Sequence, residues 1–335
     1  MSQSSDTLIQ DVEGLAPKLR DAREMIARRI IGQQKVVDQA LIALLCGGHG
    51  LLVGVPGLAK TRLVETIGTV MGLNSNRIQF TPDLMPSDIL GAEVLETAAD
   101  GSREFKFIEG PIFCQLLMAD EINRASPRTQ SALLQAMQEK VVTIAGQERK
   151  LAAPFHVLAT QNPIEQEGTY PLPEAQLDRF LLQIDVEYPT RDVERQIMLA
   201  TTGTEDAQAS PVFDTEALLS AQDVIRRIPV GDAVIEAILD LVRAARPDEA
   251  DAHPLVKEAV SWGPGPRAAQ SLMLAVRARA LLSGRLAPTT EDVVALAEPV
   301  LKHRMALGFA ARAEGRSLTD VIASLVSDLT AQKAA

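Results

Sequence analysis

The chain has 335 residues, of which 46% are hydrophobic and 23% are charged, and its formal net charge is -11 at pH 7. This length suits about two domains and the composition is typical of a folded globular protein, which excludes a small stapled scaffold and a largely disordered chain. Only 3% of the residues are aromatic. Together with the acidic charge, this excludes a broad basic surface with stacking rings for nucleic acid.

The cysteines and histidines show no metal-ligand spacing. Cys46 and Cys114 stand alone and the four histidines are scattered, which argues against a structural zinc site. The N-terminal segment carries acids and no continuous apolar run, so we expect no signal peptide. The most apolar stretch, 40–57, is broken by glycines and by Pro56. We therefore expect no membrane insertion and a cytoplasmic location.

Hydrophobic periodicity divides the first two thirds of the chain into short elements. Apolar residues at helical spacing predict opening helices over 7–30 and 34–45. Short apolar runs then predict strands over 51–53, 77–80, 116–119, 156–159 and 181–186, with helices over 60–71 and 127–140. Strands that alternate with helices indicate an α/β fold with a mainly parallel sheet covered on both faces.

Two predicted hairpins interrupt this alternation. Strands over 92–97 and 103–108 flank Asp100 and Gly101, and strands over 141–144 and 148–151 flank Ala145 and Gly146. Asp-Gly is a favoured dipeptide in tight hairpin turns, and the second pair also brings a glycine to the turn. The alternating α/β core does not need either hairpin, so both are expected to be inserts, over about 92–108 and 141–151.

The composition changes at about Thr202. Small and polar residues over 202–211 predict a linker. Helices are predicted after it over 215–228, 232–245, 266–282 and 290–305, with Thr289 or Thr290 as the cap of the last one. We therefore expect an α/β domain over 1–201 and an all-helical domain over 212–335.

The segment between the strand at 51–53 and the helix at 60–71 has the residues of a phosphate-binding loop. It consists of Gly54, Val55, Pro56, Gly57, Leu58, Ala59, Lys60 and Thr61. The two glycines permit a tight turn, Lys60 can reach the β and γ phosphates, and the Thr61 hydroxyl can bind Mg²⁺. Ala59 stands where a glycine usually precedes the lysine, and its Cβ restricts the backbone.

Asp120 and Glu121 end the strand at 116–119. A nucleotide hydrolase needs one carboxylate near Mg²⁺ and another that polarises the attacking water, and these two acids suit those roles. Asn162 follows the strand at 156–159 and could orient that water, although without the other motifs an ordinary Asn-Pro turn would be the favoured interpretation. Arg179 and Arg267 could each stabilise a transferring phosphoryl group, from a neighbouring subunit or from a mobile lid.

These motifs, in this order, resemble the MoxR family of AAA+ ATPases. The resemblance rests on residues 54–61, 120–125, 159–163 and 173–180 and extends over nearly the whole chain. The alanine at 59 is what that family usually carries. Membership implies a P-loop NTPase (AAA+) αβα core with a parallel sheet, followed by an all-helical lid, and ATP and Mg²⁺ as cofactors. It also implies that the first hairpin interrupts the second core helix and that the second precedes the third motif.

The resemblance further implies a role for individual residues. These are Lys60 and Thr61 of Walker A, Asp120 and Glu121 of Walker B, Asn162 as sensor 1, Arg179 as an arginine finger acting in trans, Arg267 as sensor 2 in the lid, and Ile31, Gly32 and Gln33 against adenine. Arg124 also stands beside the Walker B pair and could act across an interface instead of Arg179.

Membership implies an ATP-driven machine that remodels or matures protein complexes as a ring, hexameric by resemblance, with a von Willebrand factor A domain protein as adaptor. Two alternatives stay open. Arg149 and Lys150 beside the second hairpin are the local support for a DNA-directed motor, and the acidic net charge opposes it. A nucleotide-binding switch without hydrolysis is opposed by Glu121 and Asn162, which can position water.

Overall fold

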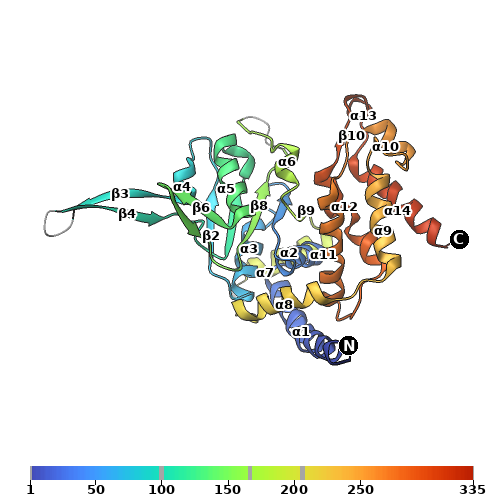
Figure 1. Ribbon diagram of the computed structural model, residues 1–335, viewed down its shortest axis with the longest axis horizontal. Coiled ribbons are helices and arrows are strands. Elements are labelled where there is room, and N and C mark those ends of the chain that lie inside the picture. Colours follow the sequence, from blue (N-terminus) through green and yellow to red (C-terminus); the bar gives the residue numbers. More distant parts are fainter. Residues whose placement is uncertain (1, 98–101, 165–167, 204–207, 335) are drawn as a thin grey trace.

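The computed structural model describes residues 2–97, 102–164, 168–203 and 208–334. Its core is a five-stranded parallel sheet with the strand order β2-β5-β8-β1-β9 (Figure 1). The strands are β1 (Gly50–Val53), β2 (Ser75–Gln79), β5 (Leu116–Asp120), β8 (His156–Gln161) and β9 (Leu182–Asp185). The predicted parallel α/β core is confirmed.

Helices pack on both faces of the sheet. Successive residues of a strand point to opposite faces, and Leu51 and Leu52 accordingly belong to separate hydrophobic clusters. The cluster around Leu52 includes α1 (Ser2–Arg29), α2 (Gln34–Leu45) and α3 (Lys60–Val70) and continues into the C-terminal helices. The cluster around Leu51 includes α4 (Pro86–Leu90) and α5 (Pro127–Glu139). Burial on both faces explains the apolar runs of the central strands β1 and β5, whereas the edge strands β2 and β9 carry several polar residues.

Both hairpins are present. β3 (Gly91–Thr97) pairs with β4 (Arg103–Glu109) in a ribbon that projects from the body of the molecule (Figure 1), and its predicted turn residues, Asp100 and Gly101, lie outside the described residues. β6 (Val141–Ile144) pairs with β7 (Gln147–Lys150), which begins one residue before the predicted strand. Ala145 and Gly146 connect them with φ of 50° and 80°, as a tight type I′ turn requires.

Three described helices of the core were not predicted from the sequence. They are α4, α6 (Glu174–Leu177) and α7 (Arg191–Thr201). None of the residues of α7 is buried. Its sequence is nevertheless strongly amphipathic, so the helical pattern was present in the chain and its apolar face is left without a buried partner in the single chain.

The C-terminal part is mainly helical. Its helices are α8 (Thr215–Arg227), α9 (Asp232–Ala244), α10 (Pro254–Ala259), α11 (Pro266–Leu282), α12 (Thr290–Leu301), α13 (Phe309–Ala313) and α14 (Leu318–Ala334). A small antiparallel ladder of β10 (Val260–Trp262) and β11 (Ala306–Leu307) is an addition to the expected all-helical lid. Residues 302–304 form a 3-10 turn, η2, so α12 ends earlier than predicted. The capping prediction is confirmed for Thr289, whose N–H donates to Asp292 Oδ2 at 2.8 Å.

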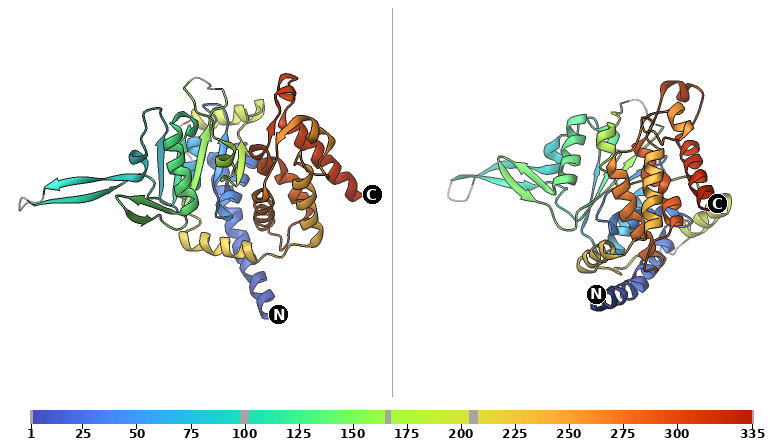
Figure 2. Two further views of the ribbon diagram at one scale, coloured as in Figure 1. Left: turned by 45° about the horizontal axis from the view of Figure 1, so that its top comes forward. Right: turned by 45° about the vertical axis from the view of Figure 1, so that its right-hand side comes forward.

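The C-terminal helices lie against the β9 edge of the sheet (Figure 2). Helix α11 packs on α2, and α12 packs on β9. Lys302 Nζ crosses the junction and donates to Asp185 Oδ2 at 2.5 Å. Residues 204–207 of the expected linker lie outside the described residues, and the proposed domain boundaries stay predictions.

The apolar stretch at 40–57 is divided between two elements. Helix α2 ends at Leu45, the chain turns through Gly47 with φ of 70°, and β1 begins at Gly50. Over the part of the chain that the structure describes, no helix is both long enough and apolar enough to cross a bilayer.

Candidate functional site

The loop at 54–59 connects β1 to α3 at the carboxyl edge of the sheet. Its first residue lies beside β8, because the Gly54 N–H donates to the Gln161 carbonyl at 3.2 Å. A Cβ at position 54 would lie 2.6 Å from the Val186 carbonyl oxygen, so only glycine fits there. Gly57 has a φ of 86°, a left-handed conformation that favours glycine. The neighbouring strands and the turn therefore explain both glycines of the motif.

Ala59 caps helix α3 in the left-handed region, with φ of 57° and ψ of 23°. This conformation costs an L-residue about 1–2 kcal/mol because its Cβ approaches the following carbonyl oxygen. The helix then begins at Lys60, and its first amide groups face the loop with the positive end of the helix dipole, an arrangement that suits phosphate. The left-handed backbone at Ala59 is therefore strained in the conformation that the loop adopts.

Ala59→Gly should stabilise the folded chain by about 1 kcal/mol, because glycine enters the left-handed region without steric cost, offset in part by its greater freedom in the unfolded chain. Gly57→Ala is the matched opposite change. A Cβ there meets no atom within 4 Å, so its expected destabilisation of about 1 kcal/mol is purely conformational. Urea unfolding midpoints measure both changes. A lower midpoint for Ala59→Gly would contradict this account of the loop.

The Lys60 ammonium turns back into the loop. It donates to the carbonyl oxygens of Gly54 and Val55, the latter at 3.1 Å. Burial lowers the pKa of Lys60, while the charges of Asp120 and Glu121 act to raise it. Lys60 follows the loop at the end of β1, and β8 lies between β1 and β5 in the sheet, so the lysine and the two acids lie at the same edge of the sheet.

Asp120 ends β5 and is only 8% exposed. Its Oδ1 accepts a hydrogen bond from the Thr160 hydroxyl of β8 at 2.6 Å. Its Oδ2 accepts one from Arg77 Nη2 of β2 at 2.5 Å. The two strands that flank β5 therefore orient both carboxylate oxygens.

Glu121 follows with a φ of 55°, a strained backbone of the kind that occurs at functional sites. Its N–H donates to Thr160 Oγ1 at 2.8 Å, so one hydroxyl orients both acids. Glu121 Oε2 accepts hydrogen bonds from Gln79 Nε2 at 2.7 Å and from Arg124 Nη1 at 3.0 Å. Arg124 is thus an ion-pair partner of the acid in its own chain.

Asn162 lies at the same edge of the sheet. It is 4% exposed and directly follows β8, whose Gln161 pairs with Val53 of β1. Its Oδ1 accepts a hydrogen bond from the Ile164 N–H at 3.1 Å, which is the geometry of an Asx turn. The interpretation as an Asn-Pro turn is confirmed, and this turn holds the amide at the edge of the sheet beside the loop at 54–59. The role of Asn162 toward water stays a prediction.

The segment of Ile31, Gly32 and Gln33 lies between α1 and α2 and contacts the loop, since Gln33 Nε2 donates to the Leu58 carbonyl at 3.3 Å. A Cβ on Gly32 would lie 2.2 Å from Val193 Cγ1 of α7. Gly32 and Gln33 line a cavity of about 200 Å³ together with Tyr188 and Val193. The lining also contains charged residues, which are Lys35, Asp185, Glu187 and Glu298. In the described residues, its connection to the loop at 54–59 is through Gln33. The aromatic, aliphatic and amide groups suit a nucleotide base.

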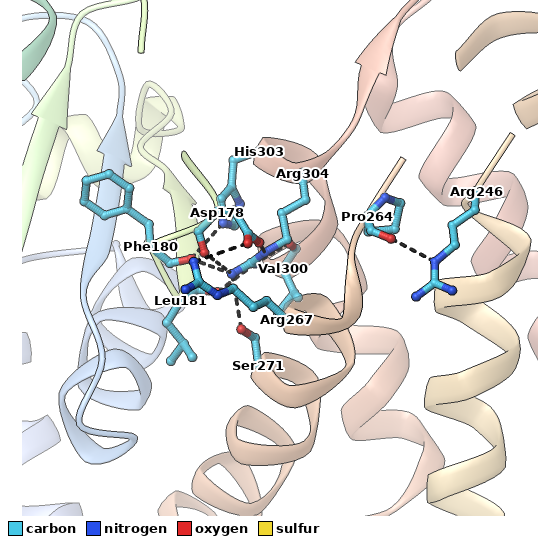
Figure 3. A network of polar contacts seen from close by, with 10 residues as sticks. All are labelled: Asp178, Phe180, Leu181, Arg246, Pro264, Arg267, Ser271, Val300, His303 and Arg304. Atoms are coloured by element: carbon cyan, nitrogen blue, oxygen red, sulfur yellow. Dashed lines mark hydrogen bonds and ion pairs between the residues drawn. The ribbon is translucent and has the colours of Figure 1, made fainter. Parts of the chain in front are cut away.

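Arg179 and Arg267 lie in a different place. They line one cavity of about 230 Å³ between the turn that precedes β9 and the first turn of α11. Within the described residues, the lining of this cavity contains neither the loop at 54–61 nor Asp120. Asp178 precedes Arg179 in the chain, and its Oδ2 is 3.5 Å from Arg267 Nη1, so this acid links the two arginines (Figure 3). Lys60, Asp120, Glu121 and Asn162 thus lie together at the carboxyl edge of the sheet. Arg179 and Arg267 lie in a separate cavity.

Several residues that contact the candidate site residues or line the same cavities were not predicted from the sequence. They are Arg77, Gln79, Thr160, Tyr188, Asp178 and Arg304. Arg77 and Gln79 are two residues apart on β2 and so share one face of the strand. Polar residues in alternate positions of a strand are a signal that a sequence carries, but only the strand order places that face beside Asp120 and Glu121.

Comparison with known proteins agrees with this arrangement. Residues 49–182 match the family described as "ATPase family associated with various cellular activities (AAA)", and residues 253–325 match an AAA lid domain. Chaperone MoxR1 of Mycobacterium tuberculosis is 43% identical over 305 residues, which cover 90% of this chain and 80% of that protein. Protein MoxR of Paracoccus denitrificans is 31% identical over 310 residues, which cover 87% and 89% of the two chains.

The fold is also similar to that of a solved structure. The crystal structure of a candidate ATPase from Cytophaga hutchinsonii has a TM-score of 0.86 and 36% sequence identity, and the match covers 98% of each chain. The family expectation from the motifs is therefore confirmed by sequence and by fold. The chain belongs to the MoxR family of AAA+ ATPases.

Proposed function

We propose that this chain hydrolyses ATP at the carboxyl edge of its sheet. The observation that carries the proposal is that Lys60, Asp120, Glu121 and Asn162 all lie at the carboxyl edge of the neighbouring strands β1, β5 and β8. Lys60 binds the β and γ phosphates, Glu121 polarises the attacking water and Asn162 orients it. Water adds to the γ phosphorus and ADP leaves, so the products are ADP and phosphate.

Thr61 and Asp120 suit Mg²⁺. Hydroxyl and carboxylate oxygens are the ligands that this ion prefers. Asp120 ends β5 at the same edge of the sheet as the loop that Thr61 follows, which supports a common site for metal and phosphate. When bound, the ion would neutralise charge that develops on the phosphate oxygens. Thr160 and Arg77 hold the Asp120 carboxylate in place for this role.

Glu121 is the proposed base. Gln79 and Arg124 both donate to its Oε2, so we assign polarisation of the water to Oε1. The left-handed backbone at Glu121, fixed by the Thr160 hydroxyl, aims the side chain. The orientation of the Glu121 carboxylate is thus set by contacts with β2, with β8 and with the 3-10 turn that contains Arg124.

We assign Arg179 and Arg267 to the site of a neighbouring subunit. A guanidinium assists phosphoryl transfer only where it can reach the γ phosphate, and these two line a cavity apart from the loop of their own chain. Arg124 is the weaker candidate because it pairs with Glu121 in its own chain. Exposed Met198 and Leu199 on α7 support an interface between copies. The proposed assembly is a hexameric ring.

Steady-state ATP hydrolysis measured against protein concentration, with the mass of the assembly determined in ATP, tests this proposal. Specific activity should rise steeply as the oligomer forms, because each site takes its arginines from a neighbour. A concentration-independent rate from a monomer would remove the trans role of Arg179. Tight ATP binding without turnover in any assembly would favour the alternative of a nucleotide-dependent switch.

We also propose that hydrolysis drives the remodelling or maturation of protein complexes in the cytoplasm, with a von Willebrand factor A domain protein as adaptor for its clients. The support is the similarity to a relative named Chaperone MoxR1. The projecting β3–β4 ribbon carries exposed apolar side chains, among them Phe105 at 72% exposure, and these suit contact with protein.

A DNA-directed motor has less support. The Arg149 guanidinium lies 3.8 Å from the centroid of the Phe107 ring, and its Nη2 is 3.8 Å from Glu93 Oε1. Its charge therefore joins the second hairpin to the first. The net charge of -11 also opposes binding to a phosphate backbone.

A further inference from the structure

Arg304 is buried where the C-terminal helices meet the core, with 1% of its side chain exposed. Its Nε donates to Asp178 Oδ1 at 2.8 Å, and its Nη2 donates to the Phe180 carbonyl at 2.6 Å (Figure 3). Its Nη1 donates to the carbonyls of Leu181 at 3.2 Å and Val300 at 2.7 Å. A buried guanidinium needs an acceptor for each N–H and an opposite charge. The turn before β9 supplies most of them.

These contacts clamp the backbone of Arg179 from both sides. Arg304 Nη2 donates to the Asp178 carbonyl at 3.3 Å as well as to the Phe180 carbonyl. His303 precedes Arg304 in the chain, and its Nε2 lies 3.0 Å from the same Phe180 carbonyl oxygen. Arg179 lies between these two carbonyls, so its backbone dihedral angles have little freedom to change.

The same guanidinium also holds the helix that carries Arg267. Arg304 Nη2 donates to the Ser271 hydroxyl at 3.2 Å, one turn along α11 from Arg267. Asp178 is shared between the two arginines, with Oδ1 bound to Arg304 and Oδ2 at 3.5 Å from Arg267. The loop before α11 is anchored separately, because Arg246 Nε donates to the Pro264 carbonyl at 2.9 Å (Figure 3).

We propose that Arg304 is a positioning residue that fixes Arg179 and Arg267 relative to each other through Asp178, so that the lid and both arginines act on the neighbouring site as one body. The inference rests on the proposed trans role of Arg179. It adds a physical link between the lid of one subunit and hydrolysis in the next.

Arg304→Lys tests the link because it keeps the charge and removes the planar fork that reaches several carbonyls at once. Misplacing a catalytic group by about 1 Å costs on the order of 10²-fold in rate. We expect a loss of turnover of that order, while the nucleotide affinity of the variant stays within about threefold of the unaltered chain, since only transition-state contacts are disturbed.

Two further variants separate positioning from folding. Arg285→Lys is the matched control, because Arg285 pairs with Asp292 inside the lid and does not contact the turn before β9 in the described residues. Its turnover should stay within about twofold. Asp178→Asn keeps an oxygen for Arg304 Nε but removes the charge shared with Arg267. It should lose about tenfold in turnover with unchanged affinity, and it carries the test if Arg304→Lys fails to fold.

Mixing each variant with Glu121→Gln subunits identifies the site that is affected. Turnover of Arg304→Lys should recover on mixing, as that of Arg179→Ala should, because Glu121→Gln subunits supply intact arginines to a neighbour with an intact base. Unchanged turnover, lost nucleotide affinity, or no recovery where Arg179→Ala does recover would overturn the link alone. If Arg179→Ala does not recover either, the proposed trans site is wrong and the inference falls with it.

Discussion

Glu121→Gln is expected to bind ATP as tightly as the unaltered chain and to lose turnover by a factor on the order of 10²–10⁴, the range that a positioned general base contributes. The amide keeps the shape of the side chain, and its oxygen can still accept from Gln79 and Arg124. It cannot take a proton from water. Fluorescent nucleotide binding and phosphate release measure the two quantities.

Glu139→Gln is the matched control for this change. Glu139 is an exposed residue at the end of α5, and its carboxylate accepts from Gln135, so its loss should leave turnover unaltered. Lys60→Ala should instead weaken nucleotide binding, because the phosphates lose their cation. Normal phosphate release by Glu121→Gln would rule out this acid as the base.

Arg179→Ala is expected to reduce turnover by a factor on the order of 10³, the lower end of what an arginine finger supplies. ATP binding should be preserved, because Arg179 lies in a cavity apart from the phosphate-binding loop of its own chain. Mixing with Glu121→Gln subunits should restore activity at those interfaces where an intact base faces an intact arginine. Steady-state turnover across a series of mixing ratios measures the recovery.

Arg124→Ala distinguishes the two candidate arginines. In the structure Arg124 Nη1 donates to Glu121 Oε2 of the same chain at 3.0 Å. A defect in Arg124→Ala should therefore lie in the variant's own site, and Glu121→Gln subunits should not relieve it. Recovery with Arg124→Ala and none with Arg179→Ala would exchange the roles of the two residues.

Helices and strands were predictable where their signal lies in residues that are close together in the chain. The strand at 116–119 was predicted within one residue of β5 because its residues are buried on both faces and therefore all apolar. The cap at Thr289 was predictable because a capping box needs only residues three apart. Helix α7 was not predicted although its sequence is strongly amphipathic, and only the tertiary structure shows that none of its residues is buried in the single chain.

The candidate site was only partly predictable. Gly54, Lys60 and Asp120 carry their chemistry in contiguous motifs, and parallel strands bring their ends to one edge whatever their order. Arg77 and Gln79 could not be placed, because nothing in the chain says that β2 lies beside β5. The roles of these residues in hydrolysis stay predictions.

By itself, the sequence determined the family, the α/β core and the helical lid, because phosphate-binding loops, caps and buried strands depend on residues that are close together in the chain. Only the tertiary structure decided the partners of each charge. It placed Arg77 on Asp120, Arg124 on Glu121, and Arg304 of the lid around the turn that carries Arg179. Such contacts join residues up to 126 positions apart, and a buried charge takes whichever acceptors the folded chain brings to it.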